Sequence, residues 1–128
     1  MTSPVWALQQ AIHAALSADA TLVASLGGPR IHDDVPQGTP YPYVTFGTWT
    51  VRNADTATES GSEIDVVIHA WSRGAGRRQV HTLVEIVRVA LHDRLVNLRH
   101  VSSDARRIAD GDTYQGTVRL RAVTEPTP

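Results

Sequence analysis

Residues 62–94, SEIDVVIHAWSRGAGRRQVHTLVEIVRVALHDR, decide the fold of this chain. From Glu63 to Trp71 apolar residues alternate with others, which predicts a strand buried mainly on one face. The inward positions are Ile64, Val66, Ile68 and Ala70. After a break at 72–76, the residues from Arg77 to His92 carry one apolar stripe, which predicts a helix. The stripe consists of Val80, Leu83, Val84, Val87 and Leu91. We expect this strand and helix to pack together as the centre of the core.

The composition is that of one soluble domain. With 128 residues, the chain is long enough to bury about two thirds of its unfolded surface. All 12 basic residues are arginine and 13 residues are acidic, so a net charge of -1 favours neither nucleic acid nor an anionic membrane as partner. The absence of cysteine excludes disulfides, thiolate metal sites and cysteine nucleophiles. With no leader and no apolar run approaching about 20 residues, we expect a protein made in the cytoplasm, without a membrane partner.

The N-terminal part predicts two helical stretches. Ser3 followed by Pro4 is typical of a helix start, with a capping oxygen and then proline at the first helical position. Asp19 is placed to cap a second, short helix from Ala20 to Leu26. Gly27, Gly28 and Pro29 must end that helix.

Two strands and a polar segment are expected next. Residues 30–35 can form a short strand, and 43–51 are rich in aromatic and β-branched residues, which favours a longer one. Residues 52–62 are small and polar and show no apolar period, so we interpret them as a long hairpin loop leading to the strand that begins at Glu63. Loops of this length in compact domains are often functional.

The C-terminal part predicts further strands. Residues 95–101 favour a short extended piece, and 106–109 with 113–123 favour a final hairpin around the turn Asp110 to Asp112. The tail at 124–128 has no core partner and is expected to be loose. The order of elements predicts one α+β domain over the whole chain, with a mostly antiparallel sheet of about four strands and two helices on one face.

A phosphate-binding turn is the strongest candidate for chemistry. Gly74-Ala75-Gly76 lies between strand and helix, where backbone N–H groups can approach a phosphate. However, Gln79 stands where the dinucleotide fingerprint has its third glycine, and a chain without lysine has no Walker sequence. We therefore favour a plain strand-to-helix turn with Ser72 near the helix cap, because Ser72 also lacks the preceding glycine of a nucleophile elbow.

Other catalytic or metal-binding patterns are weak. The six histidines show neither His-x-His nor His-Glu-x-x-His spacing, so we predict no metal and no cofactor. Acidic pairs occur at Asp33-Asp34, at Glu63 with Asp65, and at Asp110 with Asp112. The last pair is a turn sequence, while Glu63 and Asp65 share a strand face that is solvated or lies in an interface. We predict no catalytic residue.

Arginines gather at the start of the long helix. Arg73, Arg77 and Arg78 place positive charge where it opposes the helix dipole. Acidic residues of a partner chain would offset this, although solvated arginines account for the pattern equally well. The candidate interface residues are Arg52, Asn53, Asp55, Glu59, Glu63, Asp65, Arg73, Arg77 and Arg78.

The order of short motifs resembles the tail-completion or tail-terminator proteins of long-tailed phages and gene transfer agents, over nearly the whole chain. The motifs are Leu16-Ser17-Ala18-Asp19-Ala20, Leu26-Gly27-Gly28, Arg30-Ile31-His32-Asp33, Val35-Pro36, Tyr41-Pro42-Tyr43-Val44, His69-Ala70-Trp71-Ser72-Arg73, Val89-Ala90-Leu91-His92 and Val118-Arg119-Leu120-Arg121-Ala122. The resemblance implies an α+β subunit that assembles, usually as a six-fold ring, at the head-proximal end of a tail tube. It also implies the tube protein and the head connector as partners, and DNA that passes through the lumen without being gripped.

Alternative functions remain open. A neck or head-closure protein one layer above the tube would suit the same sequence. A small phosphate- or nucleotide-binding enzyme would use the turn at 74–76 together with Arg73 and Arg77. Calorimetric titration with nucleotides separates the enzyme from the structural proteins.

Overall fold

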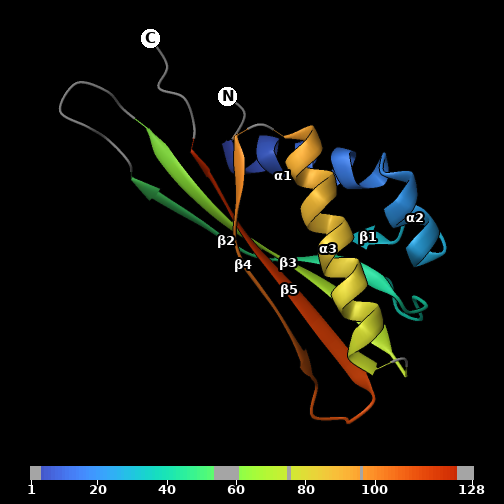
Figure 1. Ribbon diagram of the computed structural model, residues 1–128. Coiled ribbons are helices and arrows are strands. Elements are labelled where there is room, and N and C mark those ends of the chain that lie inside the picture. Colours follow the sequence, from blue (N-terminus) through green and yellow to red (C-terminus); the bar gives the residue numbers. More distant parts are fainter. Residues whose placement is uncertain (1–3, 54–60, 75, 96, 124–128) are drawn as a thin grey trace.

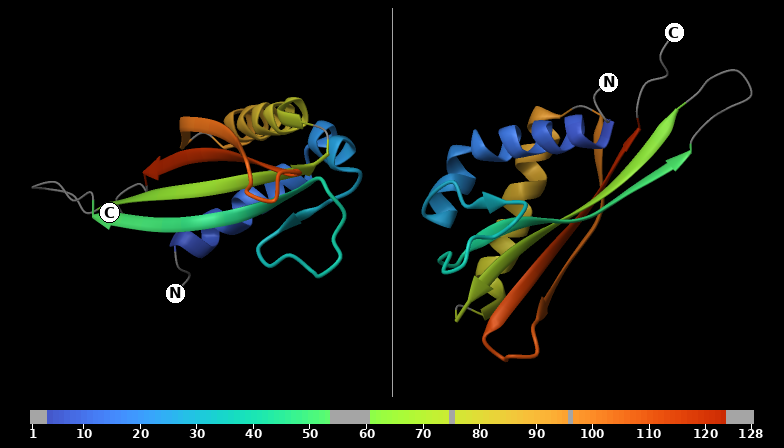
Figure 2. Two further views of the ribbon diagram at one scale, coloured as in Figure 1. Left: turned by 90° about the horizontal axis from the view of Figure 1, so that it is seen from below. Right: turned by 180° about the vertical axis from the view of Figure 1, so that it is seen from behind.

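A five-stranded sheet covered by helices on one face forms the protein (Figures 1 and 2). The computed structural model describes residues 4–53, 61–74, 76–95 and 97–123. In chain order the elements are α1 (Pro4–Ser17), α2 (Ala20–Leu26), β1 (Ile31–His32), β2 (Tyr43–Asn53), β3 (Ser62–Arg73), α3 (Gly76–Arg94), β4 (Leu98–Arg107) and β5 (Thr113–Val123). The α+β class is confirmed, with five strands and three helices in the described part where about four and two were expected.

The central strand and helix form as their periodicities predict. In β3 the inward positions Ile64, Val66, Ile68 and Ala70 are all at most 1% exposed. The five predicted stripe residues of α3 are buried as well, and Ala90 extends the stripe. Because α3 lies across β3, β5 and β4, the apolar face of the strand and the stripe of the helix cover one another (Figure 1).

The strand order β1-β2-β3-β5-β4 places β3 in the middle of the sheet. All neighbours are antiparallel except β1 and β2, which pair in parallel at Ile31 with Val44 and at His32 with Thr45. β5 spans the predicted residues and lies between β3 and β4. The separate pieces expected at 95–101 and 106–109 are one strand, β4, whose register shifts between His100 and Ser102. This irregularity obscured the strand in the sequence, because it interrupts the alternation.

The two N-terminal helices pack on the same side as α3. Asp19 caps α2 through its side chain, which accepts a hydrogen bond of 2.9 Å from the N–H of Leu22. Gly27 ends the helix in the left-handed region at φ 80°. Ile12 and Leu16 of α1 and Leu22 and Leu26 of α2 belong to one apolar core with the inward residues of the sheet. The predicted cap at Asp19 and stop at Gly27 are therefore confirmed, while the predicted cap at Ser3 lies outside the described residues.

The hairpin of β2 and β3 is longer than the sequence indicated. Arg52 and Asn53 belong to β2, where they pair with Glu63 and Ser62 of β3, so the predicted loop of 52–62 is wrong at its ends. Polar residues enter these strands because their backbones pair across the hairpin beyond the end of the core. Residues 54–60, which include Asp55 and Glu59, lie outside the described part of the chain.

The contact between α3 and β5 has no room for a side chain at Gly116. A Cβ built there would lie 2.4 Å from Cγ2 of Val84 and 2.8 Å from Cγ2 of Val80. Both valines come from the buried stripe of α3. The helix therefore approaches the sheet more closely at this point than any residue other than glycine permits.

We predict that Gly116→Ala lowers the free energy of unfolding by about 1–3 kcal/mol, the usual cost of overpacking a core. Urea denaturation followed by circular dichroism measures this loss. As a control, Gly116→Ala combined with Val84→Ala should cost less than the two single substitutions added together, because the second removes the clash of the first. Additive losses would show that the two side chains do not compete for the same space.

Candidate functional site

The face of the sheet away from the helices carries most of the polar side chains of β3 and β5. On β3 the residues that alternate with the core positions are Glu63, Asp65, Val67, His69, Trp71 and Arg73. On β5 the residues of the same face are Gln115, Thr117, Arg119 and Arg121, which pair with Trp71, His69, Val67 and Asp65, respectively. Figure 2 shows α3 on the opposite side of these strands. This helix-free face is the candidate functional surface.

A row of aromatic rings crosses one end of the helix-free face. The ring centroids of Tyr41 and Tyr43 are 4.9 Å apart, those of Tyr43 and Trp71 are 6.4 Å apart, and those of His69 and Trp71 are 5.9 Å apart. The indole N–H of Trp71 donates to Oγ1 of Thr45 at 2.9 Å, which holds the indole flat across two strands. The guanidinium of Arg73 lies 4.6 Å from the ring centre of Tyr41 and extends the row.

His69 sits in the middle of this face with one ring nitrogen fixed as an acceptor. Arg106 can only donate, and its Nε donates to Oε1 of Gln115 at 2.8 Å. The amide nitrogen of Gln115 therefore points to Nδ1 of His69, 3.2 Å away, and donates to it. Thr117 Oγ1 lies at 3.2 Å from the same nitrogen. The neutral ring then carries its proton on Nε2.

The surroundings of His69 oppose its protonation. Burial lowers the pKa of His69 below 6.5, and the positive charges of Arg119 and Arg106 lower it further. Gly47 lets the ring lie close to β2, since a Cβ at that glycine would be 2.8 Å from Nε2. The neutral imidazole of His69 therefore packs into the helix-free face as a hydrogen-bond acceptor for β5.

The other end of the face is a network of paired charges. Arg121 contacts Glu63 at 2.5 Å and Asp65 at 3.0 Å. Arg52 of β2 pairs with Asp65 and lies 4.0 Å from Glu63. The predicted sharing of one strand face by Glu63 and Asp65 is confirmed, and Arg121, which sequence reasoning missed, lies between them. These pairs join three strands at the base of the β2–β3 hairpin.

Arg73 finds its acidic partner within its own chain. Its guanidinium lies 3.6 Å from Asp110 in the β4–β5 turn, and its Nε donates to Thr113 Oγ1 at 3.2 Å. Hydrogen bonds from the N–H of Asp112 and from the hydroxyl and N–H of Thr113 lower the pKa of Asp110 to about 2. The Asp-Gly-Asp turn was visible in the sequence, but its position beside Arg73 depends on the pairing of β3 with β5.

The three predicted arginines make different contacts. Arg77 lies 5.9 Å from the ring centre of Tyr114, and Arg78 borders a separate hollow with Ser25, Gln79 and Thr82. Ser72 does not cap the helix as predicted. It belongs to β3, is fully buried, and its hydroxyl has no hydrogen-bond partner among the described residues. The alternation that buries Ala70 continues two residues further and carries Ser72 inward.

The glycine turn at 74–76 has a structural role. Gly74 has φ 77° and its N–H donates to the carbonyl of Asp112 at 2.9 Å, while Gly76 begins α3 at φ 68°. In the described part of the chain, no three histidine or acidic side chains group closely enough to hold a metal ion. None of the helices described has the length and apolar character needed to cross a membrane.

These features define a small α+β domain whose helix-free face carries paired polar and aromatic side chains. The chain belongs to the family described as Tail completion protein gp17, which matches residues 10–125. It is also similar to a chain in a solved structure, "Virion of native gene transfer agent (GTA) particle", with 29% identity and a TM-score of 0.75. That match covers 95% of this chain and 98% of the other. No curated protein matched. The resemblance seen in the sequence is confirmed, and the chain is a structural protein of phage-type tails.

We predict that NMR titration of the His69 ring gives a pKa below 6.5. Because the folded protein then binds fewer protons than the unfolded chain, this residue makes stability fall as pH drops from about 6.5 to the lowered pKa. In Gln115→Glu the pKa of His69 should rise, since a carboxylate can accept from a protonated Nδ1. A wild-type pKa of His69 at or above 6.5 would contradict the arrangement.

Proposed function

We propose that the protein is a tail terminator, a ring of identical subunits at the head-proximal end of a phage-like tail tube. The ring, which we expect to be hexameric, stops tube polymerisation and joins the tail to the head connector. The main support is the match over 98% of a chain from a gene transfer agent virion, together with membership of a tail completion family. A function of this kind requires complementary surfaces and no chemistry.

The partners follow from this position in the particle. One side of the ring contacts the last layer of the tube protein, and the other contacts the head-tail connector or stopper. The subunit is made in the bacterial cytoplasm and is assembled at the tail-neck junction.

The charge distribution suits a passage for DNA. The net charge is -1, and the arginines at 52, 119 and 121 on the helix-free face are paired with carboxylates. A surface with few free cations neutralises few phosphates, so the DNA is not held specifically as it moves through the lumen.

The end of the β2–β3 hairpin is the surface that we propose reaches a neighbouring protein. Arg52, Glu63 and Asp65, with Arg121, hold the two strands together at its base. Because these ion pairs already fix the side chains at the base, a partner that contacts them there immobilises little additional side-chain freedom on binding. We propose Asn53, Asp55 and Glu59 as further contact residues. Of these, Asp55 and Glu59 lie outside the described residues.

We predict that a producing strain without this gene makes tails of abnormal length that are separated from filled heads. Electron microscopy of lysates measures tail length and the fraction of joined particles. The gene supplied in trans should restore both. Joined particles with tails of normal length in the deletion strain would rule out a tail terminator.

We predict that replacing residues 54–61 by Asn-Gly preserves the fold and abolishes tail attachment. The short turn suits the hairpin because Asn53 and Ser62 are paired partners across the two strands. Circular dichroism checks the fold, and electron microscopy checks attachment. A loop of the same length made of glycine and serine is the matched control, because it separates the effect of length from that of sequence. Normal attachment with the short turn would show that this segment is only a connector.

A further inference from the structure

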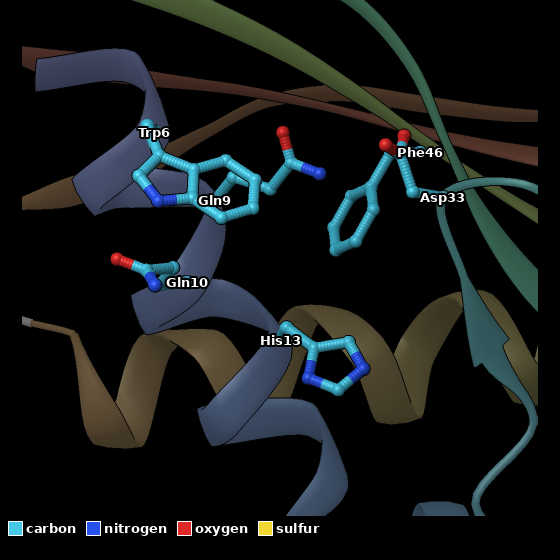
Figure 3. A pocket seen from close by; sticks show the side chains of 6 residues that line it. All are labelled: Trp6, Gln9, Gln10, His13, Asp33 and Phe46. Carbon is cyan, nitrogen blue, oxygen red and sulfur yellow. The ribbon is translucent and has the colours of Figure 1, made fainter. Parts of the chain in front are cut away.

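Two exposed surfaces at opposite edges of the sheet are not used by the features described above. One is a hollow of about 460 Å³ between α1 and the β1–β2 edge (Figure 3). It is lined by Trp6, Gln9, Gln10, His13, Asp33 and Phe46. The other lies at the β4 edge, where α3 and β4 border a second hollow of about 400 Å³.

The first hollow is apolar inside and acidic at its rim. Figure 3 shows Trp6 and Phe46 on opposite sides of it, with the Gln9 amide between them. Trp6 is 51% exposed, a large fraction for an indole. Asp33 is exposed and makes no hydrogen bond or ion pair with any residue that the structure describes. We call this surface the acidic hollow.

The β4 edge has the opposite character. Val101 is 48% exposed at the register shift of the edge strand. The neighbouring hollow is lined by four basic residues, Arg88, His92, Arg99 and His100, together with Leu98 and Leu120. Of these, Arg99 and His92 make no hydrogen bond or ion pair within the described ranges. We call Val101 and these four basic residues the basic edge.

The register of the sheet places the two surfaces at the same level along the strands. One row of paired residues runs from Trp49 through Val66 and Leu120 to His100. The adjacent row runs from Phe46 through Ile68 and Val118 to Ser103. The irregularity of β2 lies between these two rows at one edge, and Val101 lies between them at the other.

We propose that the basic edge of one copy docks into the acidic hollow of the next copy. Val101 would then insert between Trp6 and Phe46, and Arg99 would pair with Asp33. The inference rests on the proposed ring and names the surfaces that close it. Two surfaces of opposite charge at opposite edges of one chain form a heterologous interface, which closes into a ring when the rotation between subunits permits.

A second copy suits these surfaces better than another ligand does. Opposite charges, an exposed valine at one surface and an apolar hollow at the other, and a common level along the strands are all properties of the same chain. An unpaired aspartate at the rim repels a nucleic acid backbone. Each surface also lacks a charged partner that the other supplies, so association pairs Arg99 and Asp33 in a partly desolvated place.

Cross-linking in assembled particles tests the inference, because the natural chain contains no cysteine. Gln10→Cys lines the acidic hollow and Val101→Cys lies on the basic edge, both at exposed positions. Particles that carry both substitutions, treated with a short bis-maleimide, should give a ladder of covalent multiples of the subunit up to one largest species. Each single variant should remain a monomer, and particles made from the two single variants together should give dimers at most.

The matched control pairs Gln10→Cys with Ser25→Cys, since Ser25 is exposed on α2 and lines the separate hollow that Arg78 borders, which belongs to neither surface. This control should give no ladder. Absence of a ladder for Gln10→Cys with Val101→Cys in particles that contain the subunit would overturn the inference. Dimers from Val101→Cys alone would also overturn it, because they would show a symmetric contact.

Charge reversal gives an independent readout. Arg99→Asp and Asp33→Arg should each reduce the fraction of joined particles, and the double variant should restore it, because every interface of the ring then carries the reversed pair. Reduction without restoration would overturn the pairing. Particles with tails of normal length that fail to cross-link would rule out these two surfaces but not the tail terminator function. Tails of normal length in a strain without the gene would rule out the function itself.

Discussion

The close approach of α3 to β5 is the contact on which the rest of the structure depends. At Gly116 the helix side chains Val80 and Val84 occupy the space that a Cβ would need. This contact seats the buried stripe of α3 on β3, β5 and β4, and α1 and α2 then complete the same core. Because the three helices of the described chain all pack on one face, the other face of the sheet is left for polar and aromatic side chains.

That helix-free face is ordered by pairing between side chains. The Gln115 amide and Thr117 position His69, Trp71 bonds to Thr45, and the guanidinium of Arg121 bridges Glu63 and Asp65. Exposed ion pairs of this kind contribute little stability one by one, and their main effect is to fix side-chain geometry across strands. A face ordered in this way suits a structural protein of phage-type tails.

Sequence periodicity predicted the parts of the fold that local patterns control. The alternation in β3, the stripe of α3, the Asp19 cap and the bounds of β5 were all readable from residues close in the chain. Ser72 was assigned wrongly because its polarity favoured a cap, whereas the strand continued and buried it. β4 was divided in two because a register shift breaks the alternation at Val101.

By itself, the sequence determined the class of fold, the residues of the core and the family, because these depend on periodicity and on the order of short motifs. Only the tertiary structure decided which polar residues act together. Arg73 meets Asp110, and Arg121 meets Asp65, across 37 and 56 positions of the chain. Strand register sets such contacts, and a slip of one residue would move every side chain to the other face, so no local pattern specifies them.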